Sequence, residues 1–191
     1  MPKPDHNTVK PSADSLASAA QGFAKRGPAP VHLWNPDFCG DLDMRIARDG
    51  TWFYLGTPIG RLPLVKLFSG ILKREGEDYF LVTPVEKVGI KVEDVPFIAV
   101  DFELANGILT FETNVGDHVA LGAHHPMRLE HNEKGEPAPY INVRANLEAR
   151  IDRKSFYRLV ELATTHMHKG EQWLGVSSDG IFFPFMRAAA L

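Results

Sequence analysis

Polar and apolar residues alternate along most of the chain after residue 86, which is the pattern of strands that turn one face toward a core. Val88, Ile90 and Val92 alternate with other neighbours in this way. The longest run, residues 140–151, places an apolar side chain at every second position and predicts one unbroken strand. The strands predicted in this region of the chain are residues 86–92, 97–104, 108–115, 140–151, 173–176 and 181–183.

Two of these strands flank Asn106-Gly107, a dipeptide that favours a two-residue hairpin turn because both residues accept a positive φ. A two-residue turn fixes which residues face one another across the hairpin. The predicted pairs are Phe102 with Phe111 and Leu104 with Leu109 on a core face, and Asp101 with Glu112 on the outer face, beside Glu103.

Asp49-Gly50 predicts a hairpin of the same type earlier in the chain. Its predicted pairs are Ala47 with Trp52, Ile46 with Phe53 and Arg45 with Tyr54. In this register Met44, Ile46, Phe53 and Leu55 share a core face, and Arg45, Trp52 and Tyr54 share the other. Two large aromatic rings are poor material for a face turned to water, so we expect this second face to contact another region of the protein or a ligand.

Helical spacing of apolar residues predicts two helices. One covers residues 61–73 and starts near Pro63, because proline is tolerated only in the first turn. Asp152 is the expected N-cap of the other, which ends near His166 and His168. A further short helix over residues 13–25, capped by Ser12, has too few apolar residues to be stable alone.

The order strand, helix and short aromatic strand occurs twice, since a shift of 94 positions carries Tyr79 onto Trp173 and Val65 onto Leu159. We therefore predict an α+β fold of two repeated β-rich units, each with a packing helix. Residues 1–30 form an N-terminal tail or short helix, residues 31–85 the N-terminal β/α unit, and residues 86–191 the C-terminal β-rich unit with one helix.

Composition changes this picture little, but it excludes several classes of function. With 21 basic and 24 acidic residues, the formal net charge is −3, so we expect no general nucleic-acid binding. A single cysteine, Cys39, excludes an internal disulfide and a cysteine-rich zinc site. No apolar run is long enough to span a bilayer, and no signal peptide is recognisable. We expect a soluble cytoplasmic protein.

Five strings of residues stand out together: 49–54, 58–61, 64–68, 81–87 and 92–97. Taken in this order, they resemble the bacterial family catalogued as domain of unknown function 1285. The resemblance covers roughly Val31 to Phe185. It implies a duplicated α+β core whose C-terminal half is superficially like a pleckstrin-homology domain, and a signalling ligand site, suited to a nucleotide-like molecule, at the interface of the halves. It implies no established activity.

Within the strings that carry the resemblance stand Arg61, Lys66, Thr83, Glu86 and Lys87. The three basic residues could form an anion site, because ammonium and guanidinium groups near a helix start hold phosphate through charge-assisted hydrogen bonds. Trp52 or Tyr54 could stack on a base, with Arg45 beside them on the same face. The alternative is that the basic side chains are simply the solvated edges of a helix and a strand.

The residues His118, His124, His125 and His131, with Asp117, could form a metal site. Such a site requires that the ligands converge on one point. The adjacent pair precedes Pro126, so the two rings should diverge in an extended loop, and we favour loop or structural histidines.

Two further features are weak candidates for chemistry. Asp101, Glu103 and Glu112 lie on a predicted solvent face, where general acid–base catalysis is disfavoured, and they indicate an acidic patch. Two aspartates flank Cys39 at a distance of two residues and oppose a low thiol pKa, so a buried structural cysteine is favoured over a redox-active one. No familiar nucleophile, phosphate-loop or metalloprotease string occurs.

These observations favour a non-catalytic sensor or adaptor that binds a small anionic, possibly nucleotide-like ligand between the two units, without a metal or other cofactor. Two alternatives stay open. One is a hydrolase-like enzyme, with or without metal, that uses His118 and its neighbours. The other is a module that docks a protein partner on its sheet or on its acidic patch.

Overall fold

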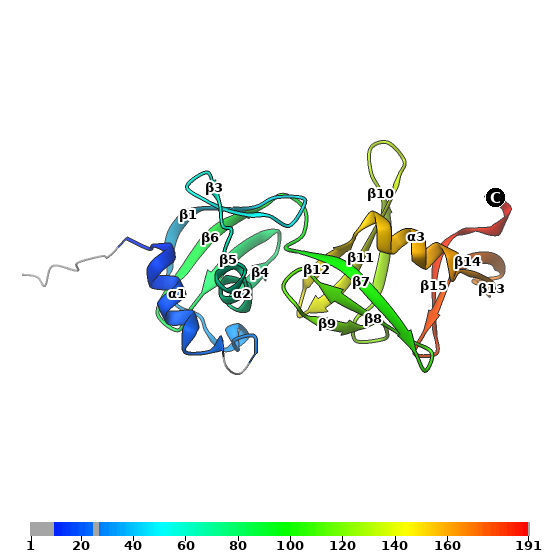
Figure 1. Cartoon of the computed structure of the whole chain (residues 1–191), viewed down its shortest axis with the longest axis horizontal. Coiled ribbons are helices and arrows are strands. Elements are labelled where there is room, and N and C mark those ends of the chain that lie inside the picture. The colour runs from blue at the N-terminus through cyan, green and yellow to red at the C-terminus, as the bar shows by residue number, and fades with distance from the viewer. Residues whose placement is uncertain (1–9, 25–26, 191) are drawn as a thin grey trace, which may run out of the picture. The chain divides into compact units, whose positions relative to one another are not determined.

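The computed structural model describes residues 10–24 and 27–190, which divide into two compact units (Figure 1). The N-terminal unit ends at Glu93 and the C-terminal unit begins at Asp94. The sequence predicts a division after residue 85, but strand β6 (Lys87–Val92) pairs with a strand on each side within the N-terminal sheet. The N-terminal unit therefore includes β6. Residues 1–9 and 25–26 of the predicted N-terminal tail lie outside the described residues.

The N-terminal unit is built on a six-stranded sheet with the order β3-β2-β1-β6-β5-β4. Its central strands, β1 and β6, run parallel, and all other neighbours are antiparallel. A 3₁₀ turn, η2 (Val31–Leu33), precedes the sheet. The remaining strands are β1 (Phe38–Ile46), β2 (Trp52–Tyr54), β3 (Thr57–Pro58), β4 (Leu72–Glu75) and β5 (Asp78–Val82).

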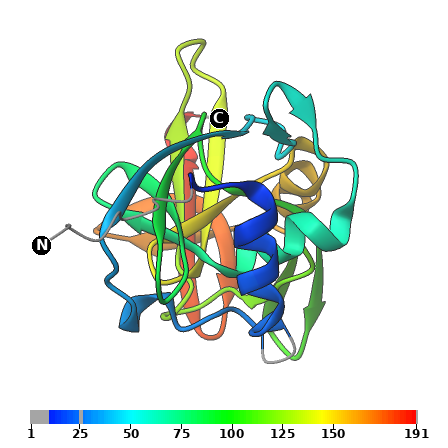
Figure 2. The same cartoon turned by 90° about the vertical axis from the view of Figure 1, so that its left-hand side faces the viewer.

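Two helices complete this unit, α1 (Ala13–Gln21) and α2 (Leu62–Gly70), and they pack against one another (Figure 2). Ser12 caps α1 as predicted, because its Oγ accepts a hydrogen bond from the Ser15 backbone N–H at 3.2 Å. Leu16 is fully buried. The short helix therefore belongs to the core of this unit and is not a loosely attached tail.

The first hairpin differs from the predicted register by one residue. Ile46 faces Trp52 and Arg45 faces Phe53. The connection is a three-residue loop, in which the Ala47 N–H donates to the Thr51 carbonyl at 2.8 Å and Gly50 has a φ of +86°. Because side chains alternate across a sheet, this shift moves Trp52 from the predicted outer face into the core.

Helix α2 covers the core face of the sheet, where the Phe68 ring stacks on the Trp52 ring with their centroids 6.2 Å apart. Trp52 is only 1% exposed. The predicted shared face of Arg45 and Trp52 is therefore wrong, and the Trp52 ring is covered by α2 instead of being open to a ligand.

The C-terminal unit contains a second six-stranded sheet, of order β10-β11-β12-β7-β8-β9, with β12 and β7 parallel at its centre. The Asn106-Gly107 hairpin has the predicted pairs, Phe102 with Phe111, Leu104 with Leu109 and Asp101 with Glu112. The strands are β7 (Phe97–Ala105), β8 (Ile108–Thr113), β9 (His118–Ala120), β10 (Met127–His131), β11 (Pro137–Arg144) and β12 (Leu147–Ile151).

Residues 140–151 form two strands rather than one. Ala145 adopts a φ of +46°, and a turn at Ala145-Asn146 joins β11 to β12. The alternation continues through this turn, since Ile141, Val143, Leu147, Ala149 and Ile151 are all buried. Hydrophobic periodicity alone therefore does not reveal the break.

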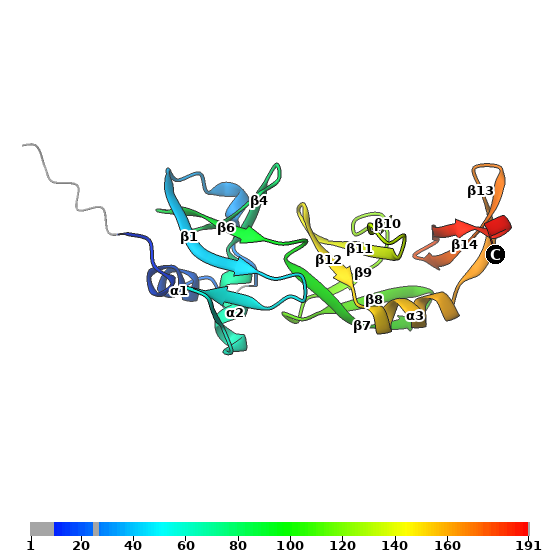
Figure 3. The same ribbon diagram turned by 90° about the horizontal axis from the view of Figure 1, so that it is seen from above.

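Helix α3 (Arg153–Glu161) follows β12 and lies beside β7 (Figure 3). Its N-cap is Asp152, as predicted, and the side chain accepts a hydrogen bond from the Ser155 N–H at 2.7 Å. His166 and His168 do not end this helix. They lie on β13 (Thr164–His168), which forms a three-stranded sheet with β14 (Glu171–Ser178) and β15 (Ile181–Arg187), before the final 3₁₀ turn η3 (Ala188–Ala190).

The two six-stranded sheets share one topology, which confirms the predicted α+β fold of two similar β-rich units. In each, two three-stranded meanders are joined so that the first and sixth strands lie parallel at the centre. The helices do not follow the predicted 94-residue shift: α2 precedes the fourth strand of its sheet, whereas α3 follows the sixth. Apolar spacing is common to amphipathic helices, so it could not identify the true repeat, which is carried by the strands.

The observed register makes Trp52 a test of the fold. We expect Trp52→Ala to lower the free energy of unfolding by about 3–5 kcal/mol, because it removes a large buried ring beneath α2. The measurement is denaturant unfolding. Phe53→Ala, at the neighbouring half-buried position, is the control and should cost less. A larger loss for Phe53→Ala than for Trp52→Ala would contradict the register.

Candidate functional site

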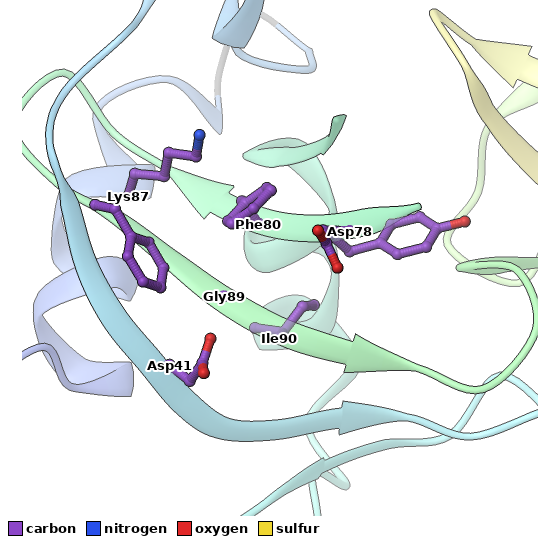
Figure 4. Close-up of a pocket in the computed structure, with 8 residues that line it drawn as sticks. Asp41, Asp78, Phe80, Lys87, Gly89 and Ile90 are labelled. Carbon is purple, nitrogen blue, oxygen red and sulfur yellow. The ribbon is translucent and has the colours of Figure 1, made fainter. Parts of the chain in front are cut away.

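The N-terminal unit has a cavity of about 340 Å³ on the sheet face opposite α2 (Figure 4). Lys87 and Gly89 of β6 alternate with the buried Val88 and Ile90, so their side-chain positions lie on this face. Strands β1 and β5 supply the walls on either side of β6. The residues that line the cavity are Phe38, Asp41, Asp78, Tyr79, Phe80, Lys87, Gly89 and Ile90.

Gly89 forms the floor of the cavity. A Cβ atom at this position would overlap Oδ1 of Asp41 and would lie 3.7 Å from Cε2 of Phe38. Glycine in the interior of a strand weakens it, and it often marks a place where another group approaches the backbone closely. Here the approaching groups are the Asp41 carboxylate and the Phe38 ring, and both lie close to the Gly89 backbone.

Two aromatic rings and an ammonium group form one wall. Phe38 meets Phe80 edge to face, with the ring centroids 6.1 Å apart. Lys87 Nζ lies 4.3 Å from the centre of the Phe80 ring, which is the geometry of a cation–π contact. The same Nζ lies 2.5 Å from Oε2 of Glu75.

The Lys87 ammonium is therefore already paired within the protein, although one carboxylate serves two lysines and the cluster keeps one positive charge. Glu75 also pairs with Lys73 at 3.0 Å. Hydrogen bonds from Lys87 and then Lys73 hold the pKa of the Glu75 carboxyl below its ordinary value, so it stays ionised. A ligand that used Lys87 as an anion site would have to compete with Glu75.

The structure separates the three basic residues of the predicted anion site. Arg61 is the N-cap of α2, and Lys66 is exposed on the same helix. Lys87 reaches the opposite face of the sheet, where α2 does not pack. These three side chains do not converge on one ligand position within the N-terminal unit.

The other predicted site residues have local partners. Arg45 lies 2.5 Å from Glu93 and over the Phe53 ring, and Tyr54 is half-buried opposite Met44. Thr83 is fully buried, and its Oγ1 accepts a hydrogen bond from the Glu86 N–H at 3.1 Å, which shapes the turn between β5 and β6. The Glu86 carboxylate accepts a bond from Ser15 of α1 at 3.5 Å. Lys87 alone of the predicted set lines the cavity.

Sequence reasoning missed Phe38, Asp41, Phe80 and Gly89. The available signal was Gly89 itself, an isolated glycine within an alternating strand. Residues 38–41 gave no strand pattern, because Cys39 and Gly40 interrupt the alternation of apolar and polar side chains. Cys39 is exposed rather than buried, and its thiol lies 3.3 Å from the Asp37 carbonyl.

In the C-terminal unit the acidic side chains Asp101, Glu103 and Glu112 lie together on an exposed face, as predicted, but two of the predicted candidates for chemistry have basic partners. Asp117 pairs with Arg144 at 2.5 Å, and Asp101 pairs with Arg158. Within residues 10–24 and 27–190, no three histidine, cysteine, aspartate or glutamate side chains are grouped to hold a metal ion. Over the same described residues, no helix is long and apolar enough to cross a membrane.

Two family models match consecutive segments of the chain. Residues 29–95 match "Domain of unknown function (DUF1285), N-terminal domain", and residues 96–185 match "Protein of unknown function (DUF1285), C-terminal domain". No curated protein matches at a significant level.

Two crystal structures of proteins from this family are similar to the chain. The one from Silicibacter pomeroyi DSS-3 has 56% identity and a TM-score of 0.84, and the match covers 94% of this chain and 98% of that one. The one from Shewanella baltica OS155 has 32% identity and a TM-score of 0.52, and the match covers 63% of this chain and 91% of that one.

The cluster of Lys73, Glu75 and Lys87 predicts a pH-dependent stability. A carboxyl whose pKa is lowered by folding stabilises the protein above its unfolded-state pKa of about 4.3 and loses this contribution as the pH falls through the folded value. We expect Glu75→Gln to cost up to about 1 kcal/mol at pH 7, because the carboxylate is partly screened by solvent. The cost should shrink below pH 4.

The measurement is denaturant unfolding of both proteins at a series of pH values. Glu77→Gln is the control, because the Glu77 side chain is 93% exposed and solvent screens its ion pair with Arg74. A pH-independent difference between the wild type and Glu75→Gln would contradict the assigned role of this carboxylate.

Proposed function

Because the chain belongs to the DUF1285 family, whose family descriptions name no activity, we propose its function from its geometry: it is a non-catalytic sensor or adaptor whose N-terminal unit binds a small molecule over Gly89. The observation that carries this proposal is the cavity of about 340 Å³ whose floor is a glycine. Its volume is in the range of small-molecule sites in proteins, which begins at about 300 Å³.

The composition of the cavity supports binding of a small organic molecule. Phe38 and Phe80 offer apolar ring surface, and Asp41, Asp78 and Lys87 offer polar groups around it. The exposed lining of this cavity is more polar than apolar, so polar contacts would contribute most of the recognition of a ligand, with the two rings beside them. The Phe38 side chain is 57% exposed, so folding buries less than half of its apolar surface. A bound ligand could bury more of this surface, and that burial would favour binding.

The position of the cavity supports a role in sensing. Its floor is β6, the strand that pairs with both β1 and β5 and whose end leads directly into the C-terminal unit. A ligand that contacts all three strands stabilises their pairing and so raises the stability of this unit. As part of this proposal, a protein partner would detect the bound state through the increased stability of the N-terminal unit.

An anionic, nucleotide-like ligand is the alternative that the family resemblance implies. It would draw on Arg61 and Lys66, which are exposed on α2. The glycine-floored cavity does not use these residues, so the two proposals make different predictions for the same variants.

A thermal-shift screen of the full chain tests the proposal. The compounds are amines, amino acids, nucleotides, sugar phosphates and carboxylates. A ligand that binds only the folded state stabilises it by about 2.7 kcal/mol at about 100 times its Kd, which raises Tm by several degrees. We expect a shift with the wild type and its loss in Gly89→Ala, because the added methyl group fills the floor.

Gly60→Ala is the matched control, because an added Cβ there meets no atom within 4 Å. It should keep the full shift. A double variant, Gly89→Ala with Asp41→Ala, removes the overlap with the carboxylate and separates loss of binding from loss of stability. No shift with any compound, or a shift that survives in both Gly89→Ala proteins, would overturn the proposal. Loss of the shift in Arg61→Ala with Lys66→Ala would favour the anionic alternative.

A further inference from the structure

We propose that the ligand of this cavity is an organic cation, a protonated amine or quaternary ammonium group on a small apolar body, held between the Phe38 ring and the Asp41 carboxylate over Gly89. This inference rests on the proposed binding function and adds the chemical class of the ligand. It follows from how β1 is paired, from the charges left free around the cavity and from the ring surface that is exposed.

The pairing of β1 with β6 brings Phe38 and Asp41 together. Phe38 faces Lys87 and Asp41 faces Gly89, so the register shifts between these two pairs. Three steps along β1 match two steps along β6, which is the signature of a bulge. Gly40, inside this segment, has a φ of +99°. Without the bulge, residues three apart in a strand would point to opposite faces.

Because of the bulge, the ring and the carboxylate lie over one point. Both are within 4 Å of the place where a Gly89 Cβ would stand. Figure 4 shows Asp41 beside Gly89, across the floor of the cavity from Phe80. An aromatic face next to a carboxylate is the chemistry that binds an ammonium group, through the negative quadrupole of the ring and the charge of the oxygen atoms.

Among the residues that line the cavity, two carboxylates have no partner. The Asp41 side chain forms no hydrogen bond or ion pair with any described residue, and the same holds for the Asp78 side chain at the other side of the floor. Lys87, the basic side chain of the lining, is paired with Glu75. An anion would meet two unpaired carboxylates here, whereas a cation would meet complementary charge.

The ring surface is also available to a cation. Phe80 already has the Lys87 ammonium against its face, which shows that this region of the sheet accommodates a positive charge on an aromatic ring. Phe38 touches Phe80 only edge to face, and more than half of its surface is exposed. The Phe38 face is therefore the second position, adjacent to Asp41, that a ligand cation would take.

The experiment is a titration of the ¹⁵N-labelled full chain, followed through the Gly89 amide signal and neighbouring signals. The probes are benzylamine and choline, with benzyl alcohol as the neutral counterpart of benzylamine and benzoate and AMP as anions. We expect benzylamine and choline to bind, and their affinity to fall as salt is added, because the attraction is between charges near the surface.

Two substitutions test the two halves of the site. Asp41→Asn should weaken benzylamine binding at least about tenfold, since it removes the free charge and keeps the shape. Asp43→Asn is the matched control, because Asp43 is an exposed carboxylate of the same strand that does not line the cavity. Phe38→Leu should weaken choline binding several-fold, because it keeps apolar surface and removes the ring.

The outcomes separate this inference from the function on which it rests. Binding of benzylamine that Asp41→Asn leaves unchanged overturns the inference. Binding of AMP or benzoate in preference to the amines, lost in Gly89→Ala, also overturns it but leaves ligand binding at this cavity intact. If no probe binds, the cationic class is wrong, and the broader thermal-shift screen decides separately whether the cavity binds any ligand.

Discussion

The parallel pairing of the first and sixth strands is the constraint on which both units depend. Each meander of three strands exposes two edges, and its small face can bury little apolar surface on its own. Joining β1 to β6, and β7 to β12, merges two meanders into one six-stranded sheet with a larger face to bury. The helices then cover one face, as Phe68 of α2 does over Trp52.

The candidate site is a local consequence of this pairing. Strand β1 follows β6 only with two shifts of register, and one of them lies between Phe38 and Asp41. The shift turns both side chains to the face that α2 leaves uncovered. Gly89 accepts them because it has no side chain, and Glu75 offsets one of the two positive charges that Lys73 and Lys87 bring beside the cavity. Backbone register, and not a dedicated loop, thus sets the chemistry of the site.

Elements whose signal is local could be predicted from the sequence, and those that depend on pairing could not. Asn106-Gly107 determines its hairpin because two residues fix the turn, and Ser12 and Asp152 cap helices because each side chain binds its own chain a few residues ahead. Asp49-Gly50 misled because the same dipeptide also fits a three-residue loop, and a single position exchanges the environments of Trp52 and Phe53. The repeated feature is the order of the six strands in each sheet. The sequence did not reveal it, because the helices stand at different positions among the strands of the two units.

The same central pair determines how each sheet would respond to force. The chain enters the N-terminal sheet at Phe38 and leaves it at Val92, which are the opposite ends of two parallel neighbours. Pulling on these two points slides β1 along β6, so the backbone bonds between them share the load at once and must yield together. Antiparallel hairpins pulled from their open ends instead unzip, because their hydrogen bonds break in succession. By the same geometry, force applied at the start of β7 and the end of β12 would load the central pair of the C-terminal sheet in shear.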